Sequence, residues 1–131
     1  LLISPQDYSS ELTILCYGGS LIEIEKVAKK LCMEDEIFVD IICSTLISEI
    51  SVDEIITSLQ RTKKLLIVEE GNSFASWSSE MIAVISETKL NFSITRISNN
   101  EIIPSSFEAE LNTLPSVNKI YKTALNIIDN D

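Results

Sequence analysis

The sequence contains no histidine, and this absence removes several kinds of active site. Hydrolases that need an imidazole base beside a serine or cysteine nucleophile are excluded within these 131 residues. Metal sites that need a histidine ligand are excluded in the same way. We therefore expect that this chain does not carry all of the chemistry that it serves.

Basic residues are scarce as well, since 10 lysines and arginines stand against 20 aspartates and glutamates, a net charge of −10. Nucleic-acid binding is disfavoured because a phosphate backbone needs a basic surface. Binding to an anionic membrane surface is disfavoured for the same reason. Every apolar run is far shorter than the roughly 20 residues of a membrane-spanning helix. We expect no nucleic-acid partner and no membrane partner.

Cysteine is sparse and unclustered. Cys16, Cys32 and Cys43 lie far apart, and no two of them have the spacing of a redox or metal-binding pair. This usage is typical of buried thiols in a protein of a reducing compartment. The expected location is the cytoplasm, or the mitochondrial or plastid matrix in a eukaryote.

The chain is rich in hydrophobic residues, at 45%, with 23% charged residues, which suits the packed core of one domain. Short apolar runs alternate with segments whose apolar residues recur at helical spacing. In chain order the pattern predicts a strand at 12–17, a helix at 20–33, a strand at 37–43, a helix from Ser51 to about 61, a strand at 65–68, a helix at 77–85, a strand at 92–97, a loop at 99–115 with one helical turn, and a helix from 116.

This alternation predicts an α/β fold with three layers, α/β/α, around a mostly parallel sheet, because nearly continuous apolar strands are covered on both faces. Residues 11–131 form the predicted domain. Residues 1–10 are a linker or the remnant of an edge strand, since the apolar Leu1–Ile3 precedes a polar stretch. The chain does not begin with methionine, so we expect it to be a piece of a longer protein.

A tight turn is predicted at Gly18 and Gly19, between the first strand and the first long helix. Ser20 and Glu23 have the spacing of a capping box at the start of that helix. The backbone amides of such a turn can hold an anion. The third glycine of a dinucleotide fingerprint is missing, however, and no phosphate-binding lysine follows, so a structural turn is the favoured interpretation.

Four stretches in this order are similar to a known family: 12–20 (LTILCYGGS), 39–45 (VDIICST), 61–71 (RTKKLLIVEEG) and 103–116, with the dipeptides Ile103-Pro104 and Leu114-Pro115. Together they resemble the C-terminal domain of the transketolase family. The likeness is greatest to the form found in the beta subunits of thiamine-diphosphate-dependent dehydrogenases of pyruvate or branched-chain 2-oxo acids. It covers about residues 11 to 128.

The resemblance implies a five-stranded mixed sheet whose first, edge strand is antiparallel. It also implies that thiamine diphosphate and magnesium bind to other domains of the parent enzyme, and that this domain holds no cofactor, no metal and no catalytic residue. Its implied role is to build contacts with other domains and subunits, and to face the lipoyl-bearing core protein of the dehydrogenase complex.

The segment 72–80 departs from the family, because it has serines where glycines are usual after the Glu-Glu-Gly motif. Two alternatives therefore stay open: a stand-alone or degenerate binding or regulatory module of the same fold, and the C-terminal domain of a transketolase-type enzyme. The second alternative usually needs phosphate-binding basic residues, and Arg96 lies inside a predicted strand.

The acidic pair Glu69 and Glu70, followed by Gly71, is a candidate site at the end of a buried strand. Ligands of doubly wound sheets bind beyond such strand ends. Two carboxylates would repel a phosphate, so we interpret the pair as a latch that braces the neighbouring loop or an interface, and not as an acid–base pair.

Aromatic residues and loop residues are candidates for subunit contacts. Phe74 and Trp77 follow the acidic pair, and aromatic side chains are enriched at interface centres. Trp77 has an equally weighted alternative, which is packing on the sheet within its own helix. Pro104 and Phe107 lie in the long loop and would pack on another subunit or wrap the edge of the sheet.

Overall fold

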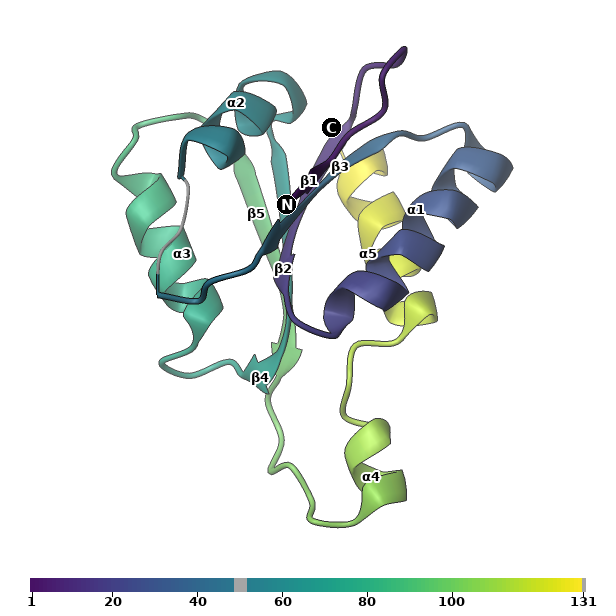
Figure 1. The fold of residues 1–131 in the computed structure, drawn as a ribbon, viewed down its shortest axis with the longest axis vertical. Helices are drawn as coiled ribbons and strands as arrows, with labels where there is room; N and C mark the ends of the chain where they lie inside the picture. Colours follow the sequence, from purple (N-terminus) through teal and green to yellow (C-terminus); the bar gives the residue numbers. More distant parts are fainter. Residues whose placement is uncertain (49–51, 131) are drawn as a thin grey trace.

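The computed structural model describes residues 1–48 and 52–130, and Figure 1 shows their arrangement. A five-stranded sheet has the order β1-β3-β2-β4-β5, in which only the β1·β3 pair is antiparallel. The strands are β1 (Leu2–Ile3), β2 (Leu12–Tyr17), β3 (Val39–Ser44), β4 (Lys64–Asn72) and β5 (Ser93–Asn99). The helices are α1 (Ser20–Asp35), α2 (Val52–Thr62), α3 (Trp77–Ser86), α4 (Phe107–Leu111) and α5 (Val117–Asp129).

Two apolar cores lie on opposite faces of the sheet. One core joins alternate residues of β2, β3 and β4 to α1 and α5, and the other joins the remaining faces of these strands to α2 and α3. This alternation follows from the period of two along a strand. The predicted three-layer α/β fold with an antiparallel edge strand is confirmed.

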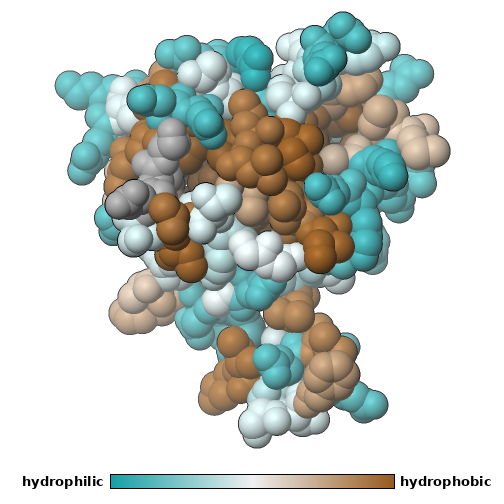
Figure 2. All heavy atoms as spheres, in the orientation of Figure 1, coloured by the Kyte–Doolittle hydropathy of each residue, from teal (hydrophilic) through white to brown (hydrophobic). Residues whose placement is uncertain are grey.

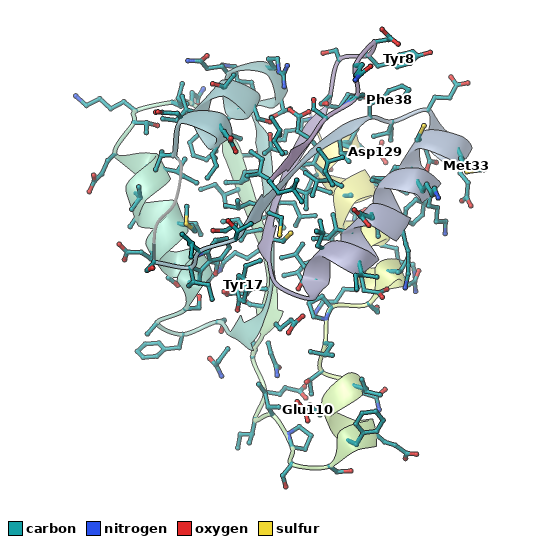
Figure 3. The ribbon with its side chains drawn as sticks, in the orientation of Figure 1. Tyr8, Tyr17, Met33, Phe38, Glu110 and Asp129 are labelled. Carbon is teal, nitrogen blue, oxygen red and sulfur yellow. The ribbon has the colours of Figure 1, made fainter. Side chains whose placement is uncertain are left out.

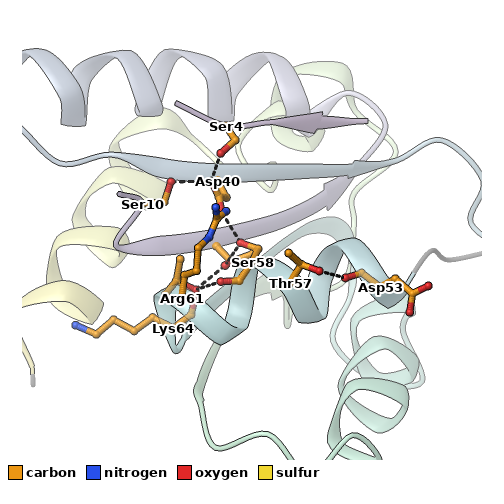
Figure 4. A network of polar contacts seen from close by, with 10 residues as sticks. Ser4, Ser10, Asp40, Asp53, Thr57, Ser58, Arg61 and Lys64 are labelled. Carbon is orange, nitrogen blue, oxygen red and sulfur yellow. Dashed lines mark hydrogen bonds and ion pairs between the residues drawn. The ribbon is translucent and has the colours of Figure 1, made fainter. Parts of the chain in front are cut away.

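A buried carboxylate connects the edge strand to the body of the sheet. Asp40, in β3, has no exposed surface, and its two oxygens accept hydrogen bonds from Ser4, Ser10, Ser58 and Arg61, as Figure 4 shows. Because the two N-terminal serines donate to one oxygen and the α2 residues to the other, Asp40 holds residues 4–10 and α2 together across the sheet. A stacked pair formed by Tyr8 and Phe38, 4.2 Å between ring centroids, closes the same end (Figure 3).

Three local expectations were wrong. Ser20 does not cap α1; the N-cap is Gly19, and the Ser20 hydroxyl donates to Glu70 instead. The third buried strand does not end at residue 68 but continues through Glu69 and Glu70 to Asn72, because β5 pairs with it as far as Asn72. Cys32 is exposed, whereas Cys16 and Cys43 are buried in the core. The predicted start of the second helix, Ser51, lies outside the described residues.

Within the described ranges, no helix is both long enough and apolar enough to cross a membrane.

The Asp40 network predicts a pH-dependent stability. Burial alone raises the pKa of Asp40, but the hydrogen bonds from the serines and from Arg61 outweigh it and leave this pKa below its ordinary value. A depressed pKa in the folded state means that the stabilisation is present above the unfolded-state pKa and is lost as the pH falls through the folded one. We expect the free energy of unfolding to fall below about pH 4, and Asp40→Asn to lose roughly 2–3 kcal/mol at neutral pH.

Urea denaturation of the wild type and of Asp40→Asn across acidic and neutral pH measures both effects. Asp7→Asn is the control, because Asp7 is exposed and has no hydrogen bond or ion pair in the described part of the chain. An Asp40→Asn variant as stable as Asp7→Asn at neutral pH would show that the network contributes nothing.

Candidate functional site

The central pair of strands brings two predicted loops together. The chain runs from β2 to β3 through α1, which lies on one face of the sheet. It runs from β4 to β5 through α3, which lies on the other face (Figure 1). The carboxyl ends of β2 and β4 therefore form the topological switch point of the sheet. We call the residues gathered there the switch-point cluster: Tyr17, Gly18, Gly19, Ser20, Glu69, Glu70, Gly71, Trp77, Ser78 and Arg96.

The Glu70 side chain lies beside the glycine turn. Its Oε1 accepts a hydrogen bond from the Ser20 hydroxyl at 3.3 Å, and a Cβ built at Gly19 would lie 3.0 Å from the same oxygen. Gly18 has a φ of +61°, which favours glycine. Because a carboxylate of the chain itself stands against this turn, an anionic ligand would be repelled there, in agreement with the structural interpretation of the turn.

Glu69 braces the start of α3. It is almost completely buried, and its carboxylate accepts hydrogen bonds from the backbone N–H and the hydroxyl of Ser78. A negative charge at the first turn of a helix is stabilised by the helix dipole. We had expected one carboxylate to brace the neighbouring glycine loop; Glu70 contacts that loop, whereas Glu69 holds its own helix.

Arg96 adds a second brace from β5. Its guanidinium donates to the Ser79 hydroxyl at 2.9 Å and to the carbonyl of Ser73 at 3.3 Å. This bracing role of Arg96 was not predicted, because the sequence does not indicate which groups an arginine within a strand will contact. Together Glu69 and Arg96 hold both ends of the loop between β4 and α3.

Trp77 packs inside the cluster. Its ring lies edge-on to Tyr17, with 4.9 Å between the centroids, and it packs against the core on the α2–α3 face. Burial, and then the charges of Glu69 and Glu70, raise the pKa of Tyr17. Gly71 lies beside the Tyr17 hydroxyl, which a Cβ at residue 71 would meet at 3.5 Å. The structure thus places Trp77 as its core-packing interpretation describes.

Phe74 points away from the domain. Its side chain is 88% exposed at the tip of the braced loop, unlike that of Trp77. The next residue, Ala75, has a φ of +49°, in the left-handed region where glycine is favoured. The left-handed conformation of this loop therefore falls on Ala75 and not on the serines around it.

The remaining two candidates, Pro104 and Phe107, lie outside the cluster, in residues 101–115, which we call the arm. The arm contains α4 and projects from the body of the domain (Figure 1). Figure 3 shows Glu110 on the arm and Tyr17 at the sheet.

The apolar side chains of the arm are exposed. No residue of α4 is buried, Phe107 is 77% exposed, and Ile102 is 93% exposed. Figure 2 shows hydrophobic side chains on the surface of the arm. Ile102 was not among the predicted contact residues, although an Ile-Ile-Pro run in a polar loop could have indicated it.

The described residues do not form a metal site, because none of their histidine, cysteine, aspartate or glutamate side chains gather in groups of three or more that could hold an ion. Glu69 is held by two donors and Glu70 by one, so the cluster is a structural brace in this geometry.

The strained backbone of Ala75 generates a prediction. A left-handed conformation costs an L-residue roughly 1–2 kcal/mol that glycine avoids, so Ala75→Gly is expected to stabilise the domain by about 1 kcal/mol. Ala83→Gly, in the middle of α3, is the matched control and should destabilise it by roughly 0.5–1 kcal/mol. Thermal and urea unfolding of both variants measure whether each substitution raises or lowers the free energy of unfolding. An equal decrease in both variants would contradict the strain at residue 75.

Comparison with known proteins gives relatives that agree with this architecture. The model of the family "Transketolase, C-terminal domain" matches residues 4–120. Over 123 residues, or 92% of its length, the chain is 24% identical to the pyruvate dehydrogenase E1 component subunit beta of Bacillus subtilis (strain 168). It spans 38% of that relative's length.

Solved structures share the fold at low identity. A split-gene transketolase, described as an inactive beta4 tetramer, superposes with a TM-score of 0.79 at 16% identity, over 92% of this chain and 40% of that one. A 2-oxoglutarate:ferredoxin oxidoreductase from Magnetococcus marinus superposes with a TM-score of 0.68 at 14% identity, over 98% of this chain and 20% of that one. With the family match covering most of its length, this chain belongs to the transketolase C-terminal domain family.

Proposed function

We propose that the chain is the C-terminal, non-catalytic assembly domain of a 2-oxo acid dehydrogenase of the pyruvate dehydrogenase beta-subunit type. The observation that carries this proposal is the position of its exposed apolar side chains. Phe74 and the apolar residues of the arm face solvent while the domain's own core is complete without them. Large apolar side chains gathered on protruding segments are typical of protein–protein contact sites.

The brace around Phe74 supports a role in binding. Arg96 donates to the carbonyl of Ser73, and Asn72 accepts from the N–H of Phe74, so both polar groups of the peptide unit that precedes the exposed ring are held. An aromatic anchor on a fixed backbone loses little conformational freedom when it binds, which favours affinity. We infer that the loop presents Phe74 to another domain or subunit of the enzyme.

Charge supports a basic partner. The chain carries a net charge of −10, and the arm adds Glu101, Glu108 and Glu110 next to its apolar residues without any basic residue. Opposite charges at the rim of an interface speed association more than they raise affinity. The proposed further role is therefore docking to a basic surface of the lipoyl-bearing core protein.

The parent enzyme would use thiamine diphosphate and magnesium to decarboxylate a 2-oxo acid and pass the acyl group to lipoamide. In this proposal both bind to other domains, since the switch-point cluster is acidic and self-braced. The proposed location is a reducing compartment, the cytoplasm or an organelle matrix, which suits free thiols at Cys16, Cys32 and Cys43.

A stand-alone or degenerate module of the same fold is the second candidate, and the serines that stand in residues 72–80 where the family usually has glycines favour it. A transketolase-type parent is the third.

The three candidate functions are distinguished by activity assays, including dye reduction, on the whole polypeptide with its partner subunit, with and without thiamine diphosphate and magnesium. Turnover of pyruvate or branched-chain 2-oxo acids identifies the dehydrogenase, and ketol transfer between sugar phosphates identifies the transketolase. No turnover by a correctly assembled protein identifies the module.

Truncation of the exposed anchors tests the assembly role. In the whole polypeptide, Phe74→Ala and Phe107→Ala are each expected to weaken subunit association about tenfold or more, because buried aromatic anchors carry much of an interface's binding energy. Sedimentation velocity over a concentration series measures the change. Met33→Ala, which removes an equally exposed side chain from α1, is the control. Association that survives both phenylalanine substitutions unchanged would contradict the proposal.

A further inference from the structure

A cavity of about 260 Å³ lies at the base of the arm, apart from the switch-point cluster. Three segments line it: the end of β5 with the residues that follow it, the residues after α4, and the first turn of α5. Its walls are polar throughout, and the lining residues are Ser98, Asn99, Asn100, Glu101, Asn112, Thr113 and Lys119.

The wall contains a buried amide that is only half satisfied. Asn99 is 8% exposed, and its Oδ1 accepts a hydrogen bond from the backbone N–H of Glu101 at 2.8 Å. That bond fixes which end of the amide is the oxygen. Its Nδ2 is buried and has no acceptor among the described residues. Buried donors in native proteins almost always have a partner, so this unpaired Nδ2 needs an explanation.

Two residues of opposite charge are among those that line the cavity. Lys119 lies in the first turn of α5 and Glu101 follows β5, and neither side chain forms an ion pair in the described part of the chain. A purely anionic ligand would meet Glu101, and a purely cationic one would meet Lys119. A ligand that carries both charges avoids both repulsions.

We propose that this cavity binds a small zwitterion of the α-amino acid class. The ligand's carboxylate accepts from the Lys119 ammonium and, by entering at the arm's base, supplies the acceptor that Asn99 Nδ2 lacks. Its ammonium group donates to the Glu101 carboxylate. The amides of Asn100 and Asn112 and the hydroxyl of Thr113 favour a polar or very small ligand side chain over an apolar one. This inference does not depend on the proposed assembly role.

Binding would join the arm to the body of the domain. The arm contributes Glu101, Asn112 and Thr113 to the cavity, while Asn99 ends β5 and Lys119 belongs to α5. A ligand held by residues from both sides therefore limits the positions that the arm can take.

Calorimetric titration of the full chain with L-serine tests the ligand class, with two matched half-ligands. L-Glycerate replaces the ammonium group by a hydroxyl, and ethanolamine lacks the carboxylate. We expect L-serine to bind at least tenfold more tightly than either half-ligand. No detectable binding of L-serine, glycine or L-asparagine would overturn the proposal, as would glycerate or ethanolamine binding as tightly as L-serine.

Charge removal at exposed positions tests the site without disturbing the core. Lys119→Met and Glu101→Gln are each expected to weaken L-serine binding tenfold or more, whereas the controls Lys122→Met and Glu108→Gln leave it unchanged, since neither control residue lines the cavity. Glu101→Gln should also strengthen the binding of L-glycerate, because it removes a repelling carboxylate. Equal losses in the controls, or glycerate binding that does not respond to Glu101→Gln, would overturn the assignment.

Discussion

The pairing of β2 with β4 in the middle of the sheet is the constraint on which the site depends. Since the chain leaves these two strands toward opposite faces, their carboxyl ends lie side by side with no helix between them. The glycine turn, Glu70 and the N-terminus of α3 meet there for that reason. In many doubly wound sheets this position holds a ligand. Here two carboxylates of the chain itself stand at this position, Glu70 against the glycine turn and Glu69 at the start of α3.

Polar contacts also fix the opposite end of the sheet, where β3 begins. Asp40 is the one carboxylate that β3 places in the interior, and hydroxyl groups and Arg61 surround it (Figure 4). A second chain of hydroxyls, from Thr13 to Ser58 and Thr62, links β2 to α2. A buried charge is tolerated only when its hydrogen bonds are satisfied, so the short β1 strand and the N-terminal segment are fixed by polar contacts more than by apolar packing.

Apolar periodicity was sufficient to predict the layers, because strands bury every second residue and helices bury residues three or four apart. These buried residues form the contacts between the sheet and the helices. Periodicity did not predict the end of β4, because polar residues continue this strand. The predicted strand ended at residue 68, whereas β4 continues to Asn72. Prediction also failed for Ser20, whose hydroxyl found a partner 50 residues away instead of the helix end. The left-handed Ala75 and the half-satisfied Asn99 amide leave no mark in a sequence, since both depend on neighbours that only the folded chain provides.

The arm is where the two proposed roles meet. Its outer side carries Ile102 and Phe107 into solvent, while its base closes the cavity with Glu101, Asn112 and Thr113. An element with no buried helical residue has little of its own packing energy to define its position. A ligand that bridges its base to β5 and α5 would therefore restrict the arm before it meets a partner, which lowers the entropy lost on association. Coupling between ligand and partner then follows from the placement of polar residues at the base and apolar residues at the tip.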